Sequence, residues 1–271
     1  MPELPEVQTV VNTLLPRVRG RRIRAVRLHR KDILTPSDVD LEASLTGRTV
    51  TGIERRGKRI VFSLDSEERF YIHLGMSGRL TIQGAETPLV RHTHLVVELD
   101  APEGCELRFV DPRRFGGVWW LGAELDGEEM GPEPLKLRSG QLATRLEKTT
   151  RAIKNALLDQ TLIAGLGNIY VDESLFAARI HPLTPANKLT QKQVAKLNRA
   201  IKATLRRALR HRGSTLRDYR DADGNSGGFQ SRHKVYGRED EPCVVCKNPI
   251  KRIVLGGRST HFCAKCQRAS S

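Results

Sequence analysis

Four of the five cysteines lie close together near the end of the sequence, in two pairs with metal-ligand spacing. The pairs are Cys243 and Cys246, and Cys263 and Cys266. Four thiolates at this CxxC spacing suit one tetrahedral zinc ion with no open coordination position, which is a structural site. Between the pairs, Ile250–Leu255 and Arg258–Phe262 flank a Gly-Gly turn. We therefore expect a β-hairpin braced by zinc, with Arg258 beside its tip.

The extreme N-terminus has the residue types for nucleophilic chemistry. Methionine before proline is commonly removed, which would leave Pro2 with a secondary amine. Amines attack aldehyde-like carbons to form imines. Because the imine of a secondary amine has no N–H proton to lose, it stays cationic and withdraws electrons, and Glu3 beside it could transfer protons. The alternative is a simple helix start, where acidic residues are also favourable.

Three turns in the first half of the chain carry side chains that suit contact with a large ligand. Lys58 opens an expected strand, Met76 lies in the turn Gly75–Gly78, and Arg113 and Phe115 lie in the turn Asp111–Gly116. Turn residues project from a rigid scaffold. They could enter a DNA duplex and fill the space left by a flipped base. Ordinary packing of the apolar pair and solvation of the cations is the alternative.

The segment Gly165–Glu173 joins two expected helices, Arg151–Leu158 and one over about 170–178. Glycines at such a junction let backbone N–H groups approach a phosphate. Asn168 could cap the second helix or donate a hydrogen bond to a phosphate. The junction is therefore a candidate for nucleic-acid contact.

The elements that must position these residues form an α+β pattern with two domains. Residues 5–18 predict a helix, and short strands predict an all-β sandwich or barrel up to about residue 121. Residues 142–211 read as helical. We expect a catalytic domain over 1–121, a linker over 122–140, a helical DNA-binding domain over 141–236 and a zinc finger over 237–271. The stretch Asp221–Gly228 reads as a flexible loop.

The charge of the chain indicates a polyanionic partner. The 46 Lys and Arg outnumber the 31 Asp and Glu, which gives a net charge of +15. Between Glu173 and Asp218 there are eleven Lys or Arg and no acid, so we expect a packed helix with a basic outer face that, with the finger, holds phosphates. Nucleic acid is the first candidate; a basic surface such as a ribosomal contact is the alternative. Cys105 reads as an ordinary thiol.

Other classes fit the sequence poorly. No apolar run approaches the length of a membrane span, and the N-terminus lacks the basic segment and hydrophobic core of a signal peptide. We therefore expect a cytoplasmic protein with no membrane partner. The absence of heptad repeats favours a monomer.

Several motifs together resemble the bacterial formamidopyrimidine-DNA glycosylases, base-excision repair enzymes for oxidised purines. The resemblance covers nearly the full length. The motifs, in the family's order, are PELPEV (residues 2–7), HLGMSG (73–78), DPRRFG (111–116), GLGNIYVDE (165–173) and the four-cysteine finger. The related endonuclease VIII branch usually begins PEGPE, so Leu4 favours the purine branch. The resemblance implies an N-terminal β-sandwich with an N-terminal helix, then a helix-two-turn-helix domain and a β-hairpin zinc finger.

The resemblance also implies catalytic roles. Pro2 is similar to the nucleophile that forms a Schiff base at C1′, Glu3 to the neighbouring acid/base, and Glu6 to a supporting carboxylate. Lys58 matches a lysine that supplies a proton during base loss and β-elimination. Arg258 matches the finger arginine that binds phosphate near the lesion and assists the later elimination.

Further correspondences concern DNA binding. Met76, Arg113 and Phe115 match the void-filling residues, with Arg113 facing the orphaned base, and Asn168 matches a phosphate-binding residue. Residues 221–230 overlie the loop that closes over the flipped base. The weaker correspondences, expected along the DNA path, are His92, Arg151 and Lys154.

The resemblance implies a bifunctional DNA glycosylase and AP lyase. Its partner is duplex DNA with an oxidised purine, such as 8-oxoguanine or a formamidopyrimidine, or with an abasic site. It cleaves the strand by β,δ-elimination and needs one structural Zn²⁺ and no redox cofactor. Two alternatives stay open: an oxidised-pyrimidine glycosylase of the endonuclease VIII branch, and a non-catalytic zinc-finger protein that binds damaged DNA.

Overall fold

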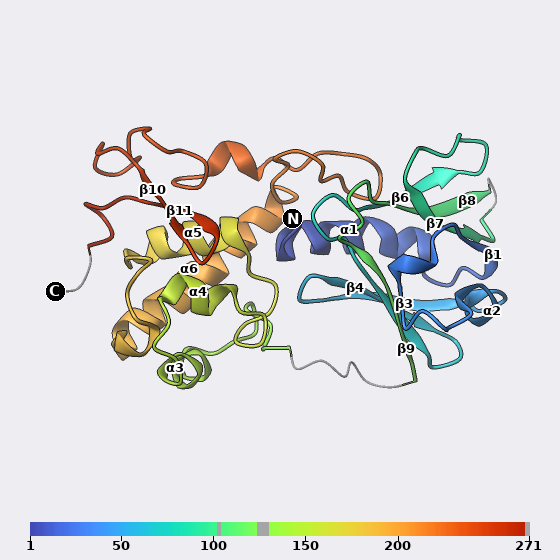
Figure 1. Cartoon of the computed structure of the whole chain (residues 1–271), viewed down its shortest axis with the longest axis horizontal. Coiled ribbons are helices and arrows are strands. Elements are labelled where there is room, and N and C mark those ends of the chain that lie inside the picture. Colours follow the sequence, from blue (N-terminus) through green and yellow to red (C-terminus); the bar gives the residue numbers. More distant parts are fainter. Residues whose placement is uncertain (102–103, 124–129, 269–271) are drawn as a thin grey trace. The chain divides into compact units, whose positions relative to one another are not determined.

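The computed structural model describes residues 1–101, 104–123 and 130–268, and the chain forms two compact units (Figure 1). The first unit comprises Met1–Glu128 and His211–Gly228, and the second comprises Glu129–Arg210 and Phe229–Ser271. The segment His211–Gly228 therefore belongs to the first unit, although it lies between two segments of the second unit in the sequence. This differs from the expected continuous helical domain over 141–236. In the described residues, no helix combines the length and the apolar composition that a membrane crossing requires.

The first unit is a sandwich of two sheets. One sheet has the order β1-β7-β8-β6 and is antiparallel, and the other has the order β2-β9-β5-β4-β3 with one parallel pair, β2 and β9. The strands are β1 (Ile23–Leu28), β2 (Leu34–Thr35), β3 (Val50–Arg56), β4 (Arg59–Leu64), β5 (Arg69–His73), β6 (Arg79–Gly84), β7 (Thr93–Leu99), β8 (Cys105–Val110) and β9 (Gly117–Gly122).

Apolar side chains from both sheets form the core of the first unit, and strands such as β4 and β8 are buried at nearly every position. Helix α1 (Leu4–Val18) adds one buried face, including Val7, Val10 and Leu14, and contacts β3, β4 and β6. The short helix α2 (Leu41–Leu45) contacts β1, and a 3₁₀ turn, η1 (Lys31–Ile33), precedes β2. The N-terminal helix thus begins at the residues expected to do chemistry.

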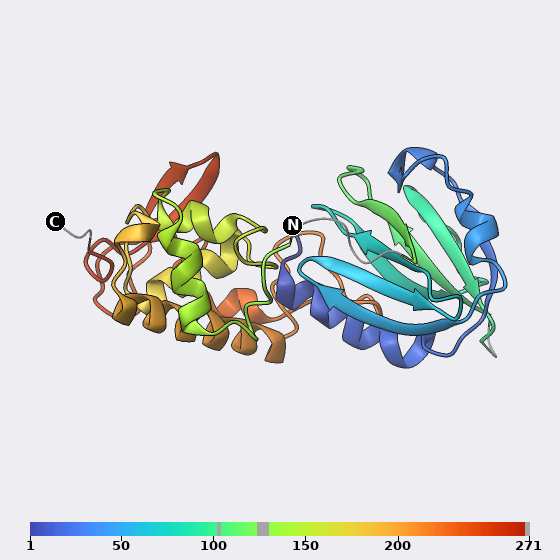
Figure 2. The same ribbon diagram turned by 90° about the horizontal axis from the view of Figure 1, so that it is seen from below.

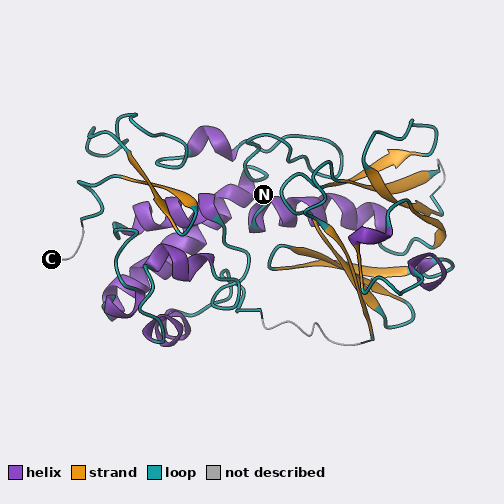
Figure 3. Ribbon diagram, in the orientation of Figure 1, coloured by secondary structure: helices purple, strands orange, loops and turns teal. Residues whose placement is uncertain are grey.

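The second unit is helical apart from one hairpin (Figure 3). Its helices are α3 (Ser139–Glu147), α4 (Ile153–Leu158), α5 (Asn168–Ala178) and α6 (Gln191–Arg210), with 3₁₀ turns η2 (Ala186–Lys188) and η3 (Phe229–Arg232). The hairpin consists of β10 (Lys251–Leu255) and β11 (Arg258–Phe262). Helix α5 lies at the centre and contacts α4, α6 and β11, which explains why nearly all its side chains are buried.

The α+β class, the sandwich with its N-terminal helix and the cysteine-braced hairpin agree with the sequence prediction. The hairpin register pairs Leu255 with Arg258 across Gly256-Gly257, as expected for a two-residue turn.

Candidate active site and metal centre

The start of the chain lies in a partly buried, charged environment within the first unit. Pro2 is buried, and Glu3 is only 2% exposed. Burial lowers the pKa of the N-terminal ammonium below its ordinary value; Glu3 and Glu6 oppose this effect, and Lys58 and Arg113 reinforce it. An amine with a lowered pKa is more often unprotonated and nucleophilic. The structure therefore brings together four of the expected site residues around the N-terminus, where removal of Met1 would expose the amine of Pro2.

Glu6 holds the N-terminal segment in place. One of its carboxylate oxygens, Oε2, accepts a hydrogen bond from the backbone N–H of Glu3 at 2.8 Å. The other, Oε1, accepts from the N–H of Ser214 at 2.6 Å, and the hydroxyl of Tyr219 donates to the Glu6 carbonyl at 3.3 Å. Glu6 thus connects the first turn of α1 to the returning segment 211–228.

Lys58 lies in the two-residue turn between β3 and β4, where Arg56 pairs with Arg59. Its side chain is only 8% exposed, although it lies at the tip of a hairpin. The guanidinium of Arg55 donates to the carbonyl of Gly57 at 2.8 Å, which fixes the turn. The hairpin therefore holds a lysine in a partly desolvated position beside the N-terminus.

The three expected void-filling residues lie on two turns that both cross between the sheets, after β5 and after β8. The turns touch: a Cβ on Gly75, which has φ +58°, would lie 2.3 Å from the backbone nitrogen of Gly116. Only glycine permits this approach. Met76 is 40% exposed and Phe115 60% exposed, so both apolar side chains project into solvent. Arg113 lies over the ring of Phe115 at 5.9 Å.

The buried carboxylate of Asp111 holds these two turns together through hydrogen bonds. Its Oδ1 accepts from the hydroxyl of Ser77 at 2.5 Å, and its Oδ2 accepts from the N–H of Gly116 at 2.8 Å. Ser77 in turn accepts from Nε of Arg113 at 3.2 Å. This buried carboxylate, to which the sequence analysis assigned no role, fixes the direction of the exposed wedge residues.

His92 lies next to the same turn. Its carbonyl accepts from the N–H of Asp111 at 3.1 Å, and its ring meets the edge of His94 at 6.4 Å. His94 in turn contacts the Asp111 carbonyl at 2.8 Å. His92 is therefore close to the wedge, consistent with its expected place along a DNA path.

The four paired cysteines form a metal site in the second unit. All four sulfur atoms lie within 4.8 Å of one another, with Cys243–Cys266 at 3.9 Å and Cys246–Cys263 at 3.4 Å. Tetrahedral zinc with Zn–S bonds of about 2.3 Å needs sulfurs about 3.8 Å apart, so the group fits. The site is structural, because four thiolates leave no position for a substrate.

The hairpin tip is fixed by the helices beneath it. Asn168, the first residue of α5, donates from its amide to the carbonyl of Ser259 at 2.9 Å. It makes no side-chain cap bond for α5, so the capping role that we considered is absent. A Cβ on Gly256 would lie 3.1 Å from the side chain of Asn155. Arg258, next to Ser259, is exposed and is thus presented on a rigid support.

Lys154 is not an exposed contact. Its side chain is 0% exposed, and its ammonium donates to Asp172 and to the Ser259 carbonyl, each at 2.7 Å. The other Asp172 oxygen accepts from the N–H of His261 at 2.9 Å. The charge of Lys154 thus helps to hold strand β11 inside the unit, which is a positioning role, and its expected place along the DNA path stays a prediction.

Glu173 anchors the chain that leads into the finger. Its carboxylate accepts from the N–H groups of Lys234, Val235 and Tyr236 at 2.9–3.0 Å. Burial raises the pKa of Glu173, while these hydrogen bonds oppose the rise. No role was predicted for Asp172 or Glu173. One sequence feature could have indicated that these two acids are buried. They are adjacent in a helix that is apolar on every side, so they face the interior and need hydrogen-bond or charged partners there.

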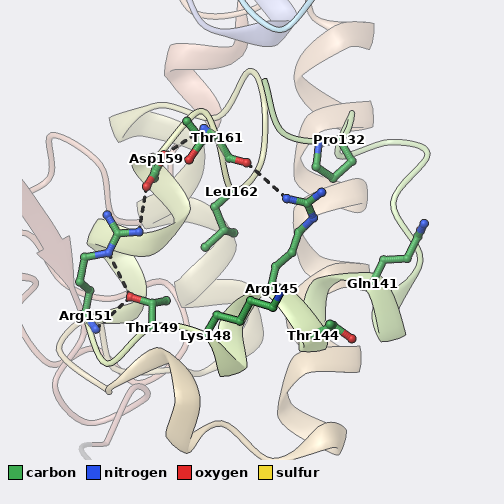
Figure 4. A pocket seen from close by; sticks show the side chains of 10 residues that line it. All are labelled: Pro132, Gln141, Thr144, Arg145, Lys148, Thr149, Arg151, Asp159, Thr161 and Leu162. Carbon is green, nitrogen blue, oxygen red and sulfur yellow. Dashed lines mark hydrogen bonds and ion pairs between the residues drawn. The ribbon is translucent and has the colours of Figure 1, made fainter. Parts of the chain in front are cut away.

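Arg151 lies at a basic cleft of about 530 Å³ in the second unit (Figure 4). Three cations line the cleft: Arg145, Lys148 and Arg151. Arg151 donates to Asp159 at 2.8 Å, yet half of its side chain remains exposed. Burial raises the pKa of Asp159, but hydrogen bonds from Thr161 and Arg151 outweigh it and hold the pKa below its ordinary value. Arg151 is thus oriented and still available to a phosphate.

The segment expected to be a flexible loop, Asp221–Gly228, is hydrogen-bonded into the first unit. Asp221 is 1% exposed and accepts from the N–H of Asn225 at 2.8 Å. The Ala222 N–H donates to the hydroxyl of Thr13 in α1, and its carbonyl accepts from Ile82 in β6. The prediction of flexibility missed these contacts because they come from residues distant in sequence.

Comparison with known proteins matches three domain models in order along the chain. They are the formamidopyrimidine-DNA glycosylase N-terminal domain over residues 1–118, the H2TH domain of the same enzymes over 130–220, and a zinc finger found in FPG and IleRS over 240–269. The chain is 46% identical to formamidopyrimidine-DNA glycosylase of Symbiobacterium thermophilum, covering 98% of this chain and 89% of that protein. It is 44% identical to that of Bacillus subtilis, covering 98% and 99%.

Solved structures agree with these matches. The Lactococcus lactis Fpg, solved with DNA containing an abasic site and also with DNA containing N7-benzyl-Fapy-dG, superimposes with a TM-score of 0.92 at 35% identity. In the abasic-site complex the match covers 98% of this chain and 100% of that chain. These matches assign the chain to the formamidopyrimidine-DNA glycosylase family.

Proposed function

We propose that this protein is a bifunctional DNA glycosylase and AP lyase of base-excision repair. It removes oxidised purines, such as 8-oxoguanine and formamidopyrimidines, from duplex DNA and then cleaves the strand. Family membership supports the activity. The observation that carries the chemistry is the position of Pro2, buried at the start of the chain and next to Glu3, with Glu6, Lys58 and Arg113 close to the N-terminus. Because chromosomal DNA is its substrate, we place the enzyme in the cytoplasm on the nucleoid, acting as a monomer.

The reaction begins at the sugar. After removal of Met1, the nitrogen of Pro2 attacks C1′; the bond from C1′ to the base breaks, and the base leaves with a proton. The nitrogen loses its proton, and O4′ is protonated as the C1′–O4′ bond breaks, which opens the sugar ring and leaves a cationic iminium between the nitrogen and C1′. The iminium withdraws electrons from the sugar. Loss of a proton from C2′ expels the 3′ phosphate, and a second elimination expels the 5′ phosphate. Water hydrolyses the remaining imine and regenerates the amine.

Different side chains of the first unit transfer protons, position the N-terminus and enter the DNA. Glu3, nearly fully buried, accepts and returns protons at the sugar, and Lys58 supplies a proton as the base leaves. Glu6 does not touch the sugar in this scheme; it positions the N-terminus through the N–H of Glu3. Met76, Arg113 and Phe115 enter the duplex and occupy the space of the flipped base.

The second unit supplies the phosphate grip. Arg258 at the hairpin tip, Arg151 at the basic cleft and Asn168 at the start of α5 bind backbone phosphates, which gives a salt-dependent and sequence-independent affinity. Zinc fixes the hairpin and takes no part in bond breaking. We assign catalysis to the sandwich, and DNA binding to the helical domain and finger.

The test compares two duplexes, one with 8-oxoguanine opposite cytosine and one with thymine glycol. We expect preferential release of 8-oxoguanine and a one-nucleoside gap flanked by phosphates. Glu3→Gln should lose activity, whereas Glu147→Gln, which changes an exposed carboxylate of α3, should not. Preference for thymine glycol would instead assign the pyrimidine branch, and tight binding without any product would assign a non-catalytic binder.

A further inference from the structure

Helix α6 carries a straight stripe of exposed cations that the proposed reaction does not use. The stripe consists of Lys192, Lys196, Arg199, Arg206 and Arg210, all exposed. At about 100° per residue these positions fall within about 80° of arc, so they lie on one side of the helix. At about 1.5 Å per residue the stripe is about 27 Å long.

The fold does not neutralise the stripe. In the described ranges, none of its five side chains makes an ion pair or hydrogen bond. The sequence has no acidic residue between Glu173 and Asp218 that could serve. Like charges three or four residues apart on a helix repel each other. The arrangement therefore opposes helix stability and points to a partner outside the chain.

The stripe faces away from the finger. The opposite face of α6 packs with Val194, Leu197, Ile201 and Leu205 buried, and the helix contacts α5 and α3. Strand β11 contacts α5. Within the second unit, Figure 2 shows the red hairpin and the orange helix α6 on opposite sides. We expected the basic helix and the finger to hold phosphates together; their placement instead makes them two separate basic surfaces.

The chemistry of the stripe selects among partners. A second copy would bring the same positive charge against it. An anionic membrane surface would need apolar side chains beside the cations, and those of α6 are buried against α5 and α3. The phosphate backbone of duplex DNA matches the stripe in charge and in length. Duplex DNA carries one negative charge per about 1.7 Å of axis, and about eight base pairs span the length of the stripe.

We propose that the α6 stripe binds the phosphate backbone of a second, undamaged DNA segment while the finger face holds the first. This rests on the proposed function for the first duplex. Such a surface lets the enzyme move between neighbouring DNA segments without full release. The contact is electrostatic, so it carries no sequence preference and weakens with salt.

The experiment uses the full-length, zinc-loaded protein and two short duplexes. One carries a stable abasic-site analogue and a fluorescence donor, and the other is undamaged and carries an acceptor. Energy transfer reports a ternary complex. The test variant replaces all five stripe residues by glutamine. The control variant replaces five dispersed exposed cations outside the finger, Arg19, Arg24, Lys31, Arg48 and Lys136, and has the same net charge.

We expect the stripe variant to keep its excision rate on a single short duplex and its affinity for the abasic duplex. Its affinity for the second duplex should fall about 60-fold at about 0.1 M salt even if only two of the five residues contact phosphate. The control variant should still bridge. Bridging that survives in the stripe variant would overturn the proposal, and so would equal losses in both variants.

Two further results separate this inference from the proposed function. If the stripe variant loses affinity for the abasic duplex as strongly as for the second duplex, the stripe belongs to the first site and the proposal is wrong. If wild type bridges duplexes but excises nothing, the proposed function fails while the second surface stands. If wild type binds a polyglutamate peptide through the stripe but shows no energy transfer with undamaged duplex, the partner is an acidic protein and the proposal is wrong.

Discussion

Replacing Asp172 by asparagine would remove the carboxylate that pairs with the buried Lys154 ammonium. The two side chains are 1% and 0% exposed, and their charged atoms lie 2.7 Å apart. Removal of one partner from a buried pair costs about 3–5 kcal/mol, since the remaining charge is desolvated and unpaired. For a unit of this size, that loss lowers Tm by about 10–20 °C.

The effect should extend to function, because the same lysine holds the carbonyl of Ser259 beside Arg258. We expect Asp172→Asn to weaken binding of abasic-site DNA and strand scission along with stability. The double variant Lys154→Met with Asp172→Asn removes both members of this buried pair. It should therefore be more stable than either single variant.

Thermal unfolding of the four proteins gives the coupling energy directly, and zinc content reports the finger. As a control, Asp223→Asn breaks an ion pair of similar length, 2.6 Å, between exposed side chains, and should cost at most about 1 kcal/mol. If Asp172→Asn were no more harmful than this control, or if the double variant were the least stable, the positioning role of Lys154 would be refuted.

Three other predictions follow from the geometry. Gly213→Ala should slow excision and lower Tm, because its Cβ would lie 2.5 Å from Oε1 of Glu6 at φ +74°; unchanged kinetics would contradict the positioning role of Glu6. Burial lowers the pKa of His233 to about 4. As the pH drops from about 6.5 to 4, this histidine is protonated in the unfolded chain before it is protonated in the folded chain, so the free energy of unfolding should fall by about 3 kcal/mol. Denaturant titrations of His233→Asn should not show this loss. Arg258→Ala should keep its zinc and lose about tenfold or more in damaged-DNA binding and scission, whereas Cys246→Ser should lose the metal; zinc loss from Arg258→Ala would show a structural role instead.

Local sequence patterns were sufficient to predict those helices and strands whose structure depends on residues close together in the sequence. The strand that begins after Lys58 and the cysteine-braced hairpin were predicted closely, because a largely apolar run and a Gly-Gly turn between CxxC pairs each specify their own structure. The N-terminal helix was predicted for the same reason, since its buried stripe repeats at helical spacing.

Long-range polar contacts could not be predicted in this way. The return of His211–Gly228 to the first unit depends on carboxylate and hydroxyl acceptors in α1, namely Glu6 and Thr13. Nothing within the returning segment identifies those partners. A glycine-rich polar stretch therefore reads as a flexible loop, although distant side chains fix its backbone.

The partners of buried charges could not be predicted for a related reason. Lys154 was expected along the DNA path from the family resemblance alone, and its pairing with Asp172 inside the unit depends on residues distant in sequence. The roles of the catalytic residues came from the family resemblance. The geometry adds which of them share one environment: the N-terminus, Glu3, Glu6, Lys58 and Arg113.

The central claim is that the amine of Pro2 is the nucleophile. Borohydride trapping on a duplex with one 8-oxoguanine opposite cytosine, followed by peptide mass mapping, tests it most directly. We predict a covalent adduct on an N-terminal peptide that begins with Pro2, and its absence in Pro2→Glu, which should still bind DNA. An adduct on another residue, or strand scission with no trapped species from a protein whose intact mass shows that Met1 is gone, would contradict the account.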